Sequence, residues 1–498
     1  MGSVATPTPA IPYAFARTHG VLAAGEEGGA VLVLVRPDAT AEGIAELRRV
    51  LKRPVRTRAV DAERFAVELA RAYDPGTAPS AALAIDSARD ADLSRLMQEL
   101  PRAEDLLEGS EANAPVIRMI NALLLQAVRE RASDLHFEPY EQRAVVRFRV
   151  DGVLSDVLEP PRALHAALVS RLKIMANLDI AEKRLPQDGR IALKLGDRAV
   201  DVRVSTLPTG SGERVVLRLL DRDAARLDLT ALGMADDTLA AVDRLIREPH
   251  GIVLVTGPTG SGKTTTLYAA LSRLPRGSVN MMTVEDPIEY ALDGVAQTQV
   301  NARVDLTFAR ALRAILRQDP DIVMIGEIRD LETAQIAVQA SLTGHLVLAT
   351  LHTNDAASAV TRLADMGVEP YLLSSSLLGV LAQRLVRTLC PACRRAAPPT
   401  EGERALLASM GVAAPAALHA PVGCSACKST GFRGRTGVYE LLPVDETMRR
   451  LVHDGAGEVA LREAARRLGQ RGMRADGARW LDDGTTSLAE LVRVTREQ

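Results

Sequence analysis

The residues with the clearest chemistry form a glycine-rich segment, which reads Gly-Pro-Thr-Gly-Ser-Gly-Lys-Thr at positions 257–264. This is a complete G-x4-G-K-[ST] phosphate-binding loop, and an apolar run at 252–255 leads into it. Its glycines let backbone N–H groups close around a phosphate at the start of the following helix, where a lysine and a threonine hydroxyl would meet phosphate oxygens and Mg2+. We expect nucleotide to be bound by Gly257, Pro258, Thr259, Gly260, Ser261, Gly262, Lys263, Thr264 and Thr265, with Thr264 also a ligand of Mg2+.

Acidic side chains follow two further apolar runs. Residues 281–284 lead to the segment that contains Glu289, and residues 322–325 lead to Gly326-Glu327. In a parallel sheet such strand ends face the ligand crevice. We therefore expect Glu327 in the place of the Walker B acid, although a Gly-Glu pair stands where an aspartate is usual, and both acids become candidates for catalysis.

Two histidines bracket a fourth apolar run at 346–350. His345 precedes the run, and His352 follows it. Either residue alone is more often a structural histidine with satisfied hydrogen bonds. At the end of a strand expected beside the phosphate-loop strand, however, His352 becomes a candidate sensor of the γ-phosphate.

Two arginines earlier in the chain lie in strand-like segments. Residues 199–205 alternate apolar and polar side chains, so Arg203 is displayed on the polar face, and Arg218 lies in a similar segment at 213–220. A surface charge is the default interpretation of both residues unless a phosphate meets them.

The four cysteines form two C-x2-C pairs, Cys390 with Cys393 and Cys424 with Cys427. This spacing is typical of a tetrahedral zinc site, and four thiolates leave no open position for water or substrate. We therefore expect structural Zn2+. A redox dithiol and metal-free core cysteines are the alternatives.

Composition bounds the class of protein. The chain has 498 residues, of which 47% are hydrophobic and 25% charged, and its formal charge is −2. Near-neutral charge argues against a protein that coats nucleic acid, and 3% aromatic residues leave few side chains to stack on bases. No apolar run is long enough to cross a bilayer, which predicts a cytoplasmic protein.

The order of segments predicts several domains. The first is a small α+β module, whose helix near Leu47 ends in a basic edge that includes Arg48 and Arg56. In the second module, Asp151-Gly152 and Asp188-Gly189 could each form a tight hairpin turn. The predicted boundaries are 1–75 for the N-terminal domain, 76–113 for a flexible linker, 114–222 for the domain before the motor, 223–388 for the motor, 389–437 for the zinc module and 438–498 for C-terminal helices.

Together these motifs resemble the traffic ATPases of type II secretion and type IV pilus assembly. The similarity covers about three quarters of the chain. It includes the segments at 132–139, 184–190, 200–208, 257–264, 283–290, 326–327 and 343–353. The zinc segment and the start of the chain look most like the type II secretion branch, the general secretion pathway E proteins.

The resemblance implies an α/β fold with a RecA-like motor domain, a preceding PAS-like α+β domain, an inserted four-cysteine zinc module and a small N-terminal α+β domain. It implies a hexameric ATP hydrolase in which Glu289 polarises the attacking water and Glu327 is the Walker B acid. Arg203 and Arg218 would approach the γ-phosphate when the two modules close on the nucleotide.

The implied partners belong to the inner membrane. They are the cytoplasmic domain of a platform protein (type II secretion protein L-like) and the polytopic platform protein (protein F-like), so the ATPase would be peripheral on the cytoplasmic face. Its basic edge, otherwise a solvated helix end, would suit an acidic partner or anionic headgroups. ATP, Mg2+ and structural Zn2+ are the implied cofactors, and nucleic acid is not expected to bind.

Three alternatives stay open. A pilus extension ATPase would share the chemistry and differ in its partners. A nucleic-acid translocase would share the phosphate-binding loop but needs a basic channel with stacking aromatics. A scaffold that binds nucleotide without hydrolysis is disfavoured, because both candidate catalytic acids, Glu289 and Glu327, are present.

Overall fold

A computed structural model describes residues 13–27, 30–51, 53–62, 64–65, 68–69, 113–195, 198–221 and 228–495. The chain divides into two compact units, residues 1–222 and 223–498. The predicted linker, apart from its last residue, lies outside the described residues. Among the described helices, none is both long and apolar enough to cross a membrane.

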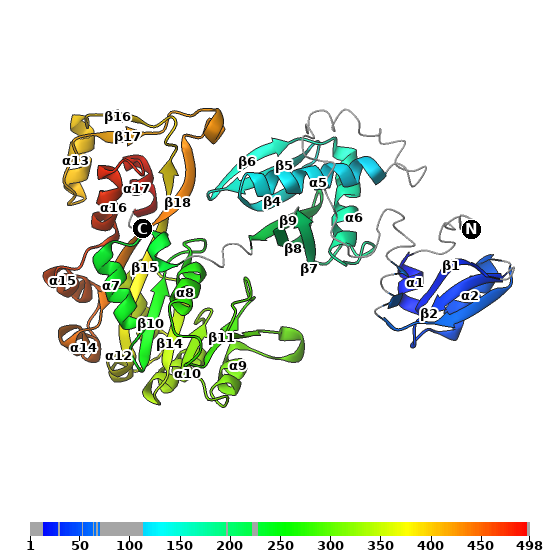
Figure 1. The fold of residues 1–498 in the computed structure, drawn as a ribbon, viewed down its shortest axis with the longest axis horizontal. Helices are drawn as coiled ribbons and strands as arrows, with labels where there is room; N and C mark the ends of the chain where they lie inside the picture. The colour runs from blue at the N-terminus through cyan, green and yellow to red at the C-terminus, as the bar shows by residue number, and fades with distance from the viewer. Residues whose placement is uncertain are drawn as a thin grey trace. The chain divides into compact units, whose positions relative to one another are not determined.

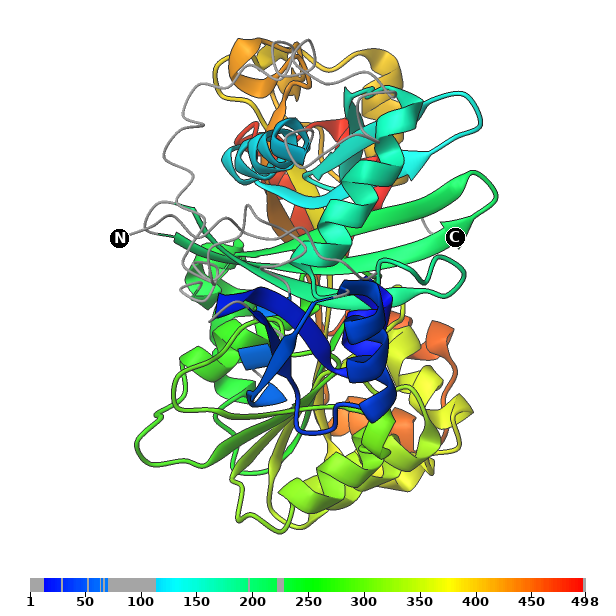
Figure 2. The same cartoon turned by 90° about the vertical axis from the view of Figure 1, so that its right-hand side faces the viewer.

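The first described part is a three-stranded sheet with helices packed on it (Figures 1 and 2). Its strand order is β1-β2-β3, and β2 pairs antiparallel with β1 and parallel with β3. Leu47 on the second helix is fully buried against the sheet. The elements are α1 (Tyr13–His19), β1 (Val21–Glu27), β2 (Ala30–Val35), α2 (Ala41–Leu51) and β3 (Val55–Ala59).

Residues 113–221 form an antiparallel six-stranded sheet in the order β6-β5-β4-β9-β8-β7. Helices α5 and α6 cover one face, where the apolar side chains of the alternating strands make a single core (Figures 1 and 2). The elements are α5 (Asn113–Arg129), β4 (Ala132–Pro139), β5 (Ala144–Val150), β6 (Val153–Leu158), α6 (His165–Met175), β7 (Gln187–Leu195), β8 (Arg198–Thr209) and β9 (Gly212–Asp221).

Of the two predicted Asp-Gly turns, one is confirmed and the other is wrong. Asp151 and Gly152 have φ values of 49° and 83° and join β5 to β6. Asp188 and Gly189 instead lie within β7 and pair with β8. A Cβ at Gly189 would lie 2.6 Å from the carbonyl oxygen of Ala176, so close packing accounts for this glycine.

The second unit is built on a seven-stranded sheet in the order β12-β11-β13-β14-β10-β15-β18. All neighbouring pairs are parallel except β15 with β18. The predicted strands are present, and β14 pairs with the phosphate-loop strand β10 as expected. The strands are β10 (Gly251–Thr256), β11 (Met281–Glu285), β12 (Ala296–Gln299), β13 (Ile322–Ile325), β14 (Leu346–Leu351), β15 (Leu377–Leu389) and β18 (Phe432–Pro443).

Helices cover both faces of this sheet, because its central strands are buried on both sides (Figure 1). Leu254 faces a core shared with α9 to α12, and Val255 faces a core shared with α7 and α8. These helices are α7 (Asp236–Leu245), α8 (Lys263–Ser272), α9 (Phe308–Ile315), α10 (Leu331–Leu342), α11 (Ala356–Asp365) and α12 (Pro370–Ser376).

The cysteines lie in the connection between β15 and β18. The two strands pair as far as Leu389 with Phe432, so this connection comprises residues 390–431. The predicted zinc module, residues 389–437, also includes residues that pair in the two strands. It contains β16 (Arg395–Ala397), α13 (Glu401–Ser409) and β17 (Leu418–Ala420). The C-terminal helices begin after β18 and are α14 (Glu446–His453), α15 (Glu458–Arg467), α16 (Met473–Asp482) and α17 (Leu488–Thr495).

Candidate nucleotide site and cysteine cluster

The phosphate-binding loop joins β10 to α8, and its backbone is shaped by glycine. Gly257, Gly260 and Gly262 have φ values of 147°, 80° and 87°, which disfavour other residues. A Cβ at Gly257 would lie 2.4 Å from the carbonyl oxygen of Gln383, whereas a Cβ at Gly260 would meet open space. The loop is therefore tightly held at its base and open at its tip, where residues 258–260 are exposed.

The residues of the loop fit a bound phosphate. Lys263 and Thr264 open helix α8, so this helix directs its N-terminal N–H groups at the loop. The hydroxyl oxygen of Ser261 is buried and has no hydrogen-bond partner among the described residues. A bound ATP would supply the phosphoryl group and Mg2+ would neutralise its charge, with Thr264 as the residue predicted to offer a hydroxyl ligand.

Lys263 is almost fully buried, with 8% of its surface exposed. Its ammonium group donates hydrogen bonds to the carbonyl oxygens of Gly257 at 2.8 Å and Pro258 at 3.2 Å. Burial lowers the pKa of Lys263, and the charge of Glu327 acts in the opposite direction. The Lys263 side chain is thus folded back against the backbone of the phosphate-binding loop.

Lys263, His352 and Glu327 form one chain of contacts. The Lys263 Nζ atom lies 3.5 Å from Nδ1 of His352, and Nε2 of His352 lies 3.2 Å from Glu327. Because an ammonium group only donates, His352 Nδ1 accepts, and its Nε2–H then donates to the carboxylate. The structure therefore brings three of the residues predicted for the site together: Lys263 at the start of α8, His352 just after β14 and Glu327 just after β13.

His345 has a different place. Its Nδ1 lies 2.9 Å from the carbonyl oxygen of Ala340 and 3.2 Å from the hydroxyl of Thr343, at the C-terminal end of α10. These contacts match the structural interpretation of this histidine.

Glu327 also contacts Arg329, which lies outside the predicted motifs. Arg329 is paired with Glu327 and lies 3.9 Å from the carboxylate of Asp286. The hydrogen bond with Glu327 raises the pKa of the Arg329 guanidinium. Gly326 is closely packed, since a Cβ there would lie 3.2 Å from the carbonyl oxygen of Val284 on the neighbouring strand.

Gln383 is a second contact that the sequence did not reveal. It lies on β15, is 1% exposed, and donates to the carbonyl oxygen of Ser261 at 2.7 Å. Its amide oxygen accepts a hydrogen bond from Thr266 on α8 at 2.8 Å. Gln383 therefore ties the loop at Ser261, and the helix that follows it at Thr266, to a strand more than a hundred residues away in sequence.

Glu289 lies in the loop between β11 and β12. Its backbone N–H donates to the Tyr268 hydroxyl over 3.4 Å, which links it to the helix that follows the phosphate-binding loop. Burial raises the pKa of the neighbouring Tyr290 to about 12, with Glu289 and Glu285 adding to the effect.

Arg203 and Arg218 belong to the other compact unit, where they are paired neighbours on β8 and β9. Arg218 is about half-exposed and donates to the buried carboxylate of Asp134 at 2.8 Å. Their contact with nucleotide stays a prediction.

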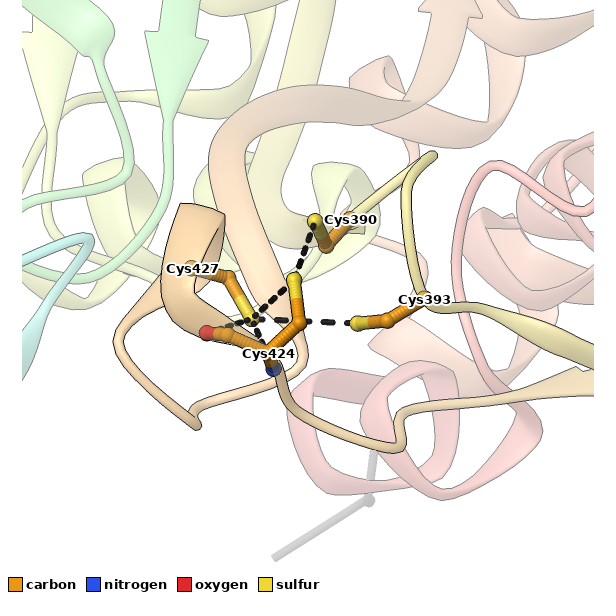
Figure 3. A group of neighbouring side chains, drawn as sticks. All are labelled: Cys390, Cys393, Cys424 and Cys427. Atoms are coloured by element: carbon orange, nitrogen blue, oxygen red, sulfur yellow. Dashed lines mark hydrogen bonds between the residues drawn. The ribbon is translucent and has the colours of Figure 1, made fainter.

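The four cysteine sulfurs converge within 4.8 Å of one another (Figure 3). The separations are 3.9 Å for Cys390 with Cys424, 3.8 Å for Cys393 with Cys427 and 3.7 Å for Cys424 with Cys427. Sulfurs placed tetrahedrally at zinc's bond length of ~2.3 Å would be separated by about 3.8 Å. The cluster therefore has the dimensions of a four-thiolate zinc site.

Backbone N–H groups support the same interpretation. The N–H groups of Cys424 and Gly431 each donate to the Cys427 sulfur at 3.2 Å. Burial acts to raise the pKa of the Cys427 thiol, but the hydrogen bonds from the backbone and from the Cys424 and Cys393 side chains together outweigh it and lower the pKa to about 6. Stabilisation of the thiolate suits a metal ligand.

Comparison with known proteins identifies the family of this chain. Residues 109–493 match the type II/IV secretion system protein family, and residues 10–73 match a domain family of GSPII protein E. The chain is 60% identical to type II secretion system protein HxcR of Pseudomonas aeruginosa, over 98% of this chain and 99% of that protein. It is 53% identical to type II secretion system ATPase E of Vibrio cholerae, over 98% and 97%.

A solved structure shows the fold. The Legionella pneumophila ATPase DotB aligns with a TM-score of 0.55 and 21% identity, covering 75% of this chain and 94% of that one. The α/β fold predicted from the sequence is thereby confirmed. The chain belongs to the type II/IV secretion system protein family, and within that family to the ATP-hydrolysing E proteins of type II secretion.

Proposed function

We propose that the protein is a homo-hexameric motor that couples ATP hydrolysis to pseudopilus assembly and protein export. The observation that carries the proposal is the contact chain from Lys263 at the start of α8, through His352 after β14, to Glu327 after β13. A P-loop lysine, an acid and a sensor in mutual contact are the parts that phosphoryl transfer requires. The near-complete alignment with type II secretion proteins supports the secretion role.

In this proposal each site residue has a defined task. The loop 257–265 holds the phosphates, Lys263 contacts their β- and γ-oxygens, and Thr264 coordinates Mg2+. Glu289 polarises the attacking water, and Glu327 acts as the Walker B acid. His352, which touches both Lys263 and Glu327, detects whether the γ-phosphate is present.

Arg203 and Arg218 complete the proposed site from the preceding PAS-like domain. An arginine at a transferring phosphoryl group stabilises the charge that develops there, and its contribution can be ~1,000-fold in rate. Approach of this domain to the motor would couple hydrolysis to movement.

The proposed partners are the cytoplasmic domain of a protein L-like platform component and a polytopic protein F-like component. These contacts would place the ATPase in the cytoplasm, peripheral on the inner membrane. The N-terminal domain offers exposed arginines at Arg48, Arg56 and Arg58, which suit an acidic partner. We retain the predicted division into docking domain, linker, PAS-like domain, motor, zinc module and C-terminal helices.

Glu289→Gln is expected to retain ATP binding and lower turnover at least ~10-fold, because the amide cannot polarise water as a carboxylate does. Phosphate release measures the turnover, and fluorescence of a labelled ATP analogue measures binding. Asp293→Asn, an exposed acid in the same loop, is the matched control and should leave turnover unchanged. Normal turnover in Glu289→Gln would remove this residue from the proposed chemistry.

Glu327→Gln is also expected to bind ATP and to hydrolyse it at least ~10-fold more slowly. The substitution removes the charge that faces His352 and Arg329 but preserves the shape of the side chain. Glu332→Gln provides the control, since Glu332 is an exposed acid nearby and pairs with Arg313. Unchanged turnover would show that Glu327 is not the Walker B acid.

A further inference from the structure

The position of the proposed base Glu289 depends on a loop without regular secondary structure. Residues 286–295 connect β11 to β12. A displacement of a reacting group by ~1 Å can cost orders of magnitude in rate, so an effective base needs a fixed backbone. The relevant contacts are those that hold this loop against the phosphate-binding helix.

Tyr268 occupies the junction between the two. It lies on α8 one helical turn after Thr264, so both side chains are on the same face of the helix. Only 1% of Tyr268 is exposed. Its ring contacts that of Tyr290 edge to face, with centroids 4.7 Å apart, so the helix and the loop meet through packed aromatic rings.

Every hydrogen-bonding position of the Tyr268 hydroxyl is used. The hydroxyl donates to the Glu285 carboxylate. It accepts from the backbone N–H of Glu289 at 3.4 Å and from the Gln297 amide at 3.3 Å. A phenol offers one donor and two acceptor lone pairs, so all three are engaged. Burial, followed by the charge of Glu285, raises the pKa of Tyr268 and keeps the hydroxyl protonated as a donor.

Glu285 and Gln297 anchor this hydroxyl to the sheet. Glu285, at the end of β11, is 2% exposed and accepts from the Thr283 hydroxyl at 2.5 Å and from Gln297 at 3.0 Å. Gln297, on β12, accepts from the backbone N–H of Leu292 at 2.7 Å. The buried carboxylate thus orients the Tyr268 hydroxyl so that one lone pair accepts from the loop at Glu289 and the other from Gln297 on β12.

We propose that Tyr268 is a positioning residue for hydrolysis, which fixes the Glu289 loop relative to the phosphate-binding helix through Glu285. The inference rests on the proposed role of Glu289. Tyr268 itself touches neither nucleotide nor water in this role. It sets the distance between the helix that bears Lys263 and Thr264 and the backbone that bears the base.

The test is Tyr268→Phe in the full chain, which removes one oxygen atom and keeps the ring. Turnover is expected to fall about 10-fold, because the loop loses its link to the helix. KM for ATP and the affinity for a fluorescent ADP analogue should change less than about 2-fold, because the phosphate-binding loop is untouched. A structural role alone would not separate turnover from binding in this way.

Tyr439→Phe is the matched control. Tyr439 is also buried, and its hydroxyl donates to the Leu232 carbonyl oxygen at 2.9 Å. This variant loses a comparable hydrogen bond and should lower the melting temperature similarly while retaining turnover. An equal fall in turnover in both variants would overturn the proposal.

A double variant tests the route of the effect. In the Glu289→Gln background, Tyr268→Phe should change turnover by less than about 2-fold, because both changes act on the same group. If the two substitutions instead lower turnover by factors that multiply, they act independently, and the proposed role of Tyr268 is overturned. If the single variant Glu289→Gln leaves turnover normal, the proposed role of Glu289 is wrong. If Glu289→Gln lowers turnover but Tyr268→Phe leaves it normal, only the proposed role of Tyr268 is wrong. If Tyr268→Phe does not fold, Glu285→Gln takes its place and must lower turnover while leaving ATP affinity unchanged. If Glu285→Gln does not separate turnover from binding in this way, the proposed role of Tyr268 is overturned.

Discussion

Lys263→Ala is expected to abolish ATP turnover, with a loss of at least ~100-fold, while the protein stays folded. Removing one pre-organised donor to a developing negative charge typically costs ~100- to 1,000-fold in rate. Lys263 is positioned for such a task, since it is almost fully buried and is held by the carbonyl oxygens of Gly257 and Pro258.

Stability should change little in this variant. Pro258 lies at the exposed tip of the loop, so water can reach its carbonyl oxygen once the ammonium group is removed. Gln383 still holds the loop at Ser261, so the loop keeps its anchor to the sheet. His352 and Glu327 keep their own contact, which is independent of the lysine.

Phosphate release and thermal melting, measured on the same preparation, test this prediction. Arg276→Ala is the control, because Arg276 is an exposed cation just beyond the same helix and should retain full turnover. Full turnover in Lys263→Ala would end the assignment of the loop to catalysis.

Removal of zinc is expected to have the second large effect. We expect about one Zn per chain by elemental analysis, and Cys427→Ser should lose the metal and disorder the connection between β15 and β18. Apparent binding free energies of structural zinc are about 10–16 kcal/mol, which is comparable with the stability of a whole domain. Cys427 is the most informative ligand to replace, because two backbone N–H groups also donate to its sulfur.

The loss of order should be local. Leu407, Val412 and Leu418 of this connection pack against apolar residues of β15, β18 and the C-terminal helices. The seven-stranded sheet has its own cores, so nucleotide binding should survive. Limited proteolysis should therefore cut between residues 390 and 431 in Cys427→Ser and spare the phosphate-binding loop.

Ser425→Ala, between the two cysteines of the second pair, is the control and should retain zinc. A metal-free preparation that resists proteolysis as well as the zinc-loaded protein would contradict a structural site.

Local chemistry explains what could be predicted from the sequence. A glycine-rich loop before a lysine and a threonine has few structural solutions, because only glycine tolerates the required backbone angles. Short apolar runs followed by polar residues were enough to place strands β10, β11, β13 and β14 and to expect Glu327 and His352 at their ends. Two C-x2-C pairs likewise predicted a converging group of sulfurs, and the structure brings them together.

The two Asp-Gly pairs show that local sequence does not determine every turn. Asp151-Gly152 and Asp188-Gly189 have the same letters, yet the first is a turn and the second lies within a strand. The difference arises from the packing of Gly189 against Ala176, a contact with the end of another element. Local turn propensity cannot report such a contact.

The sequence by itself therefore determined the chemical groups available to this protein: a glycine-rich phosphate-loop motif, two candidate acids, a histidine and four thiols at a spacing that suits zinc. Only the tertiary structure decided how these groups are held. Gln383, Arg329 and Tyr268 carry no motif of their own, and they matter because folding places them against Ser261, Glu327 and Glu289. A motif is encoded by neighbours along the chain, whereas the contacts that position it come from strands and helices that meet only in the folded sheet.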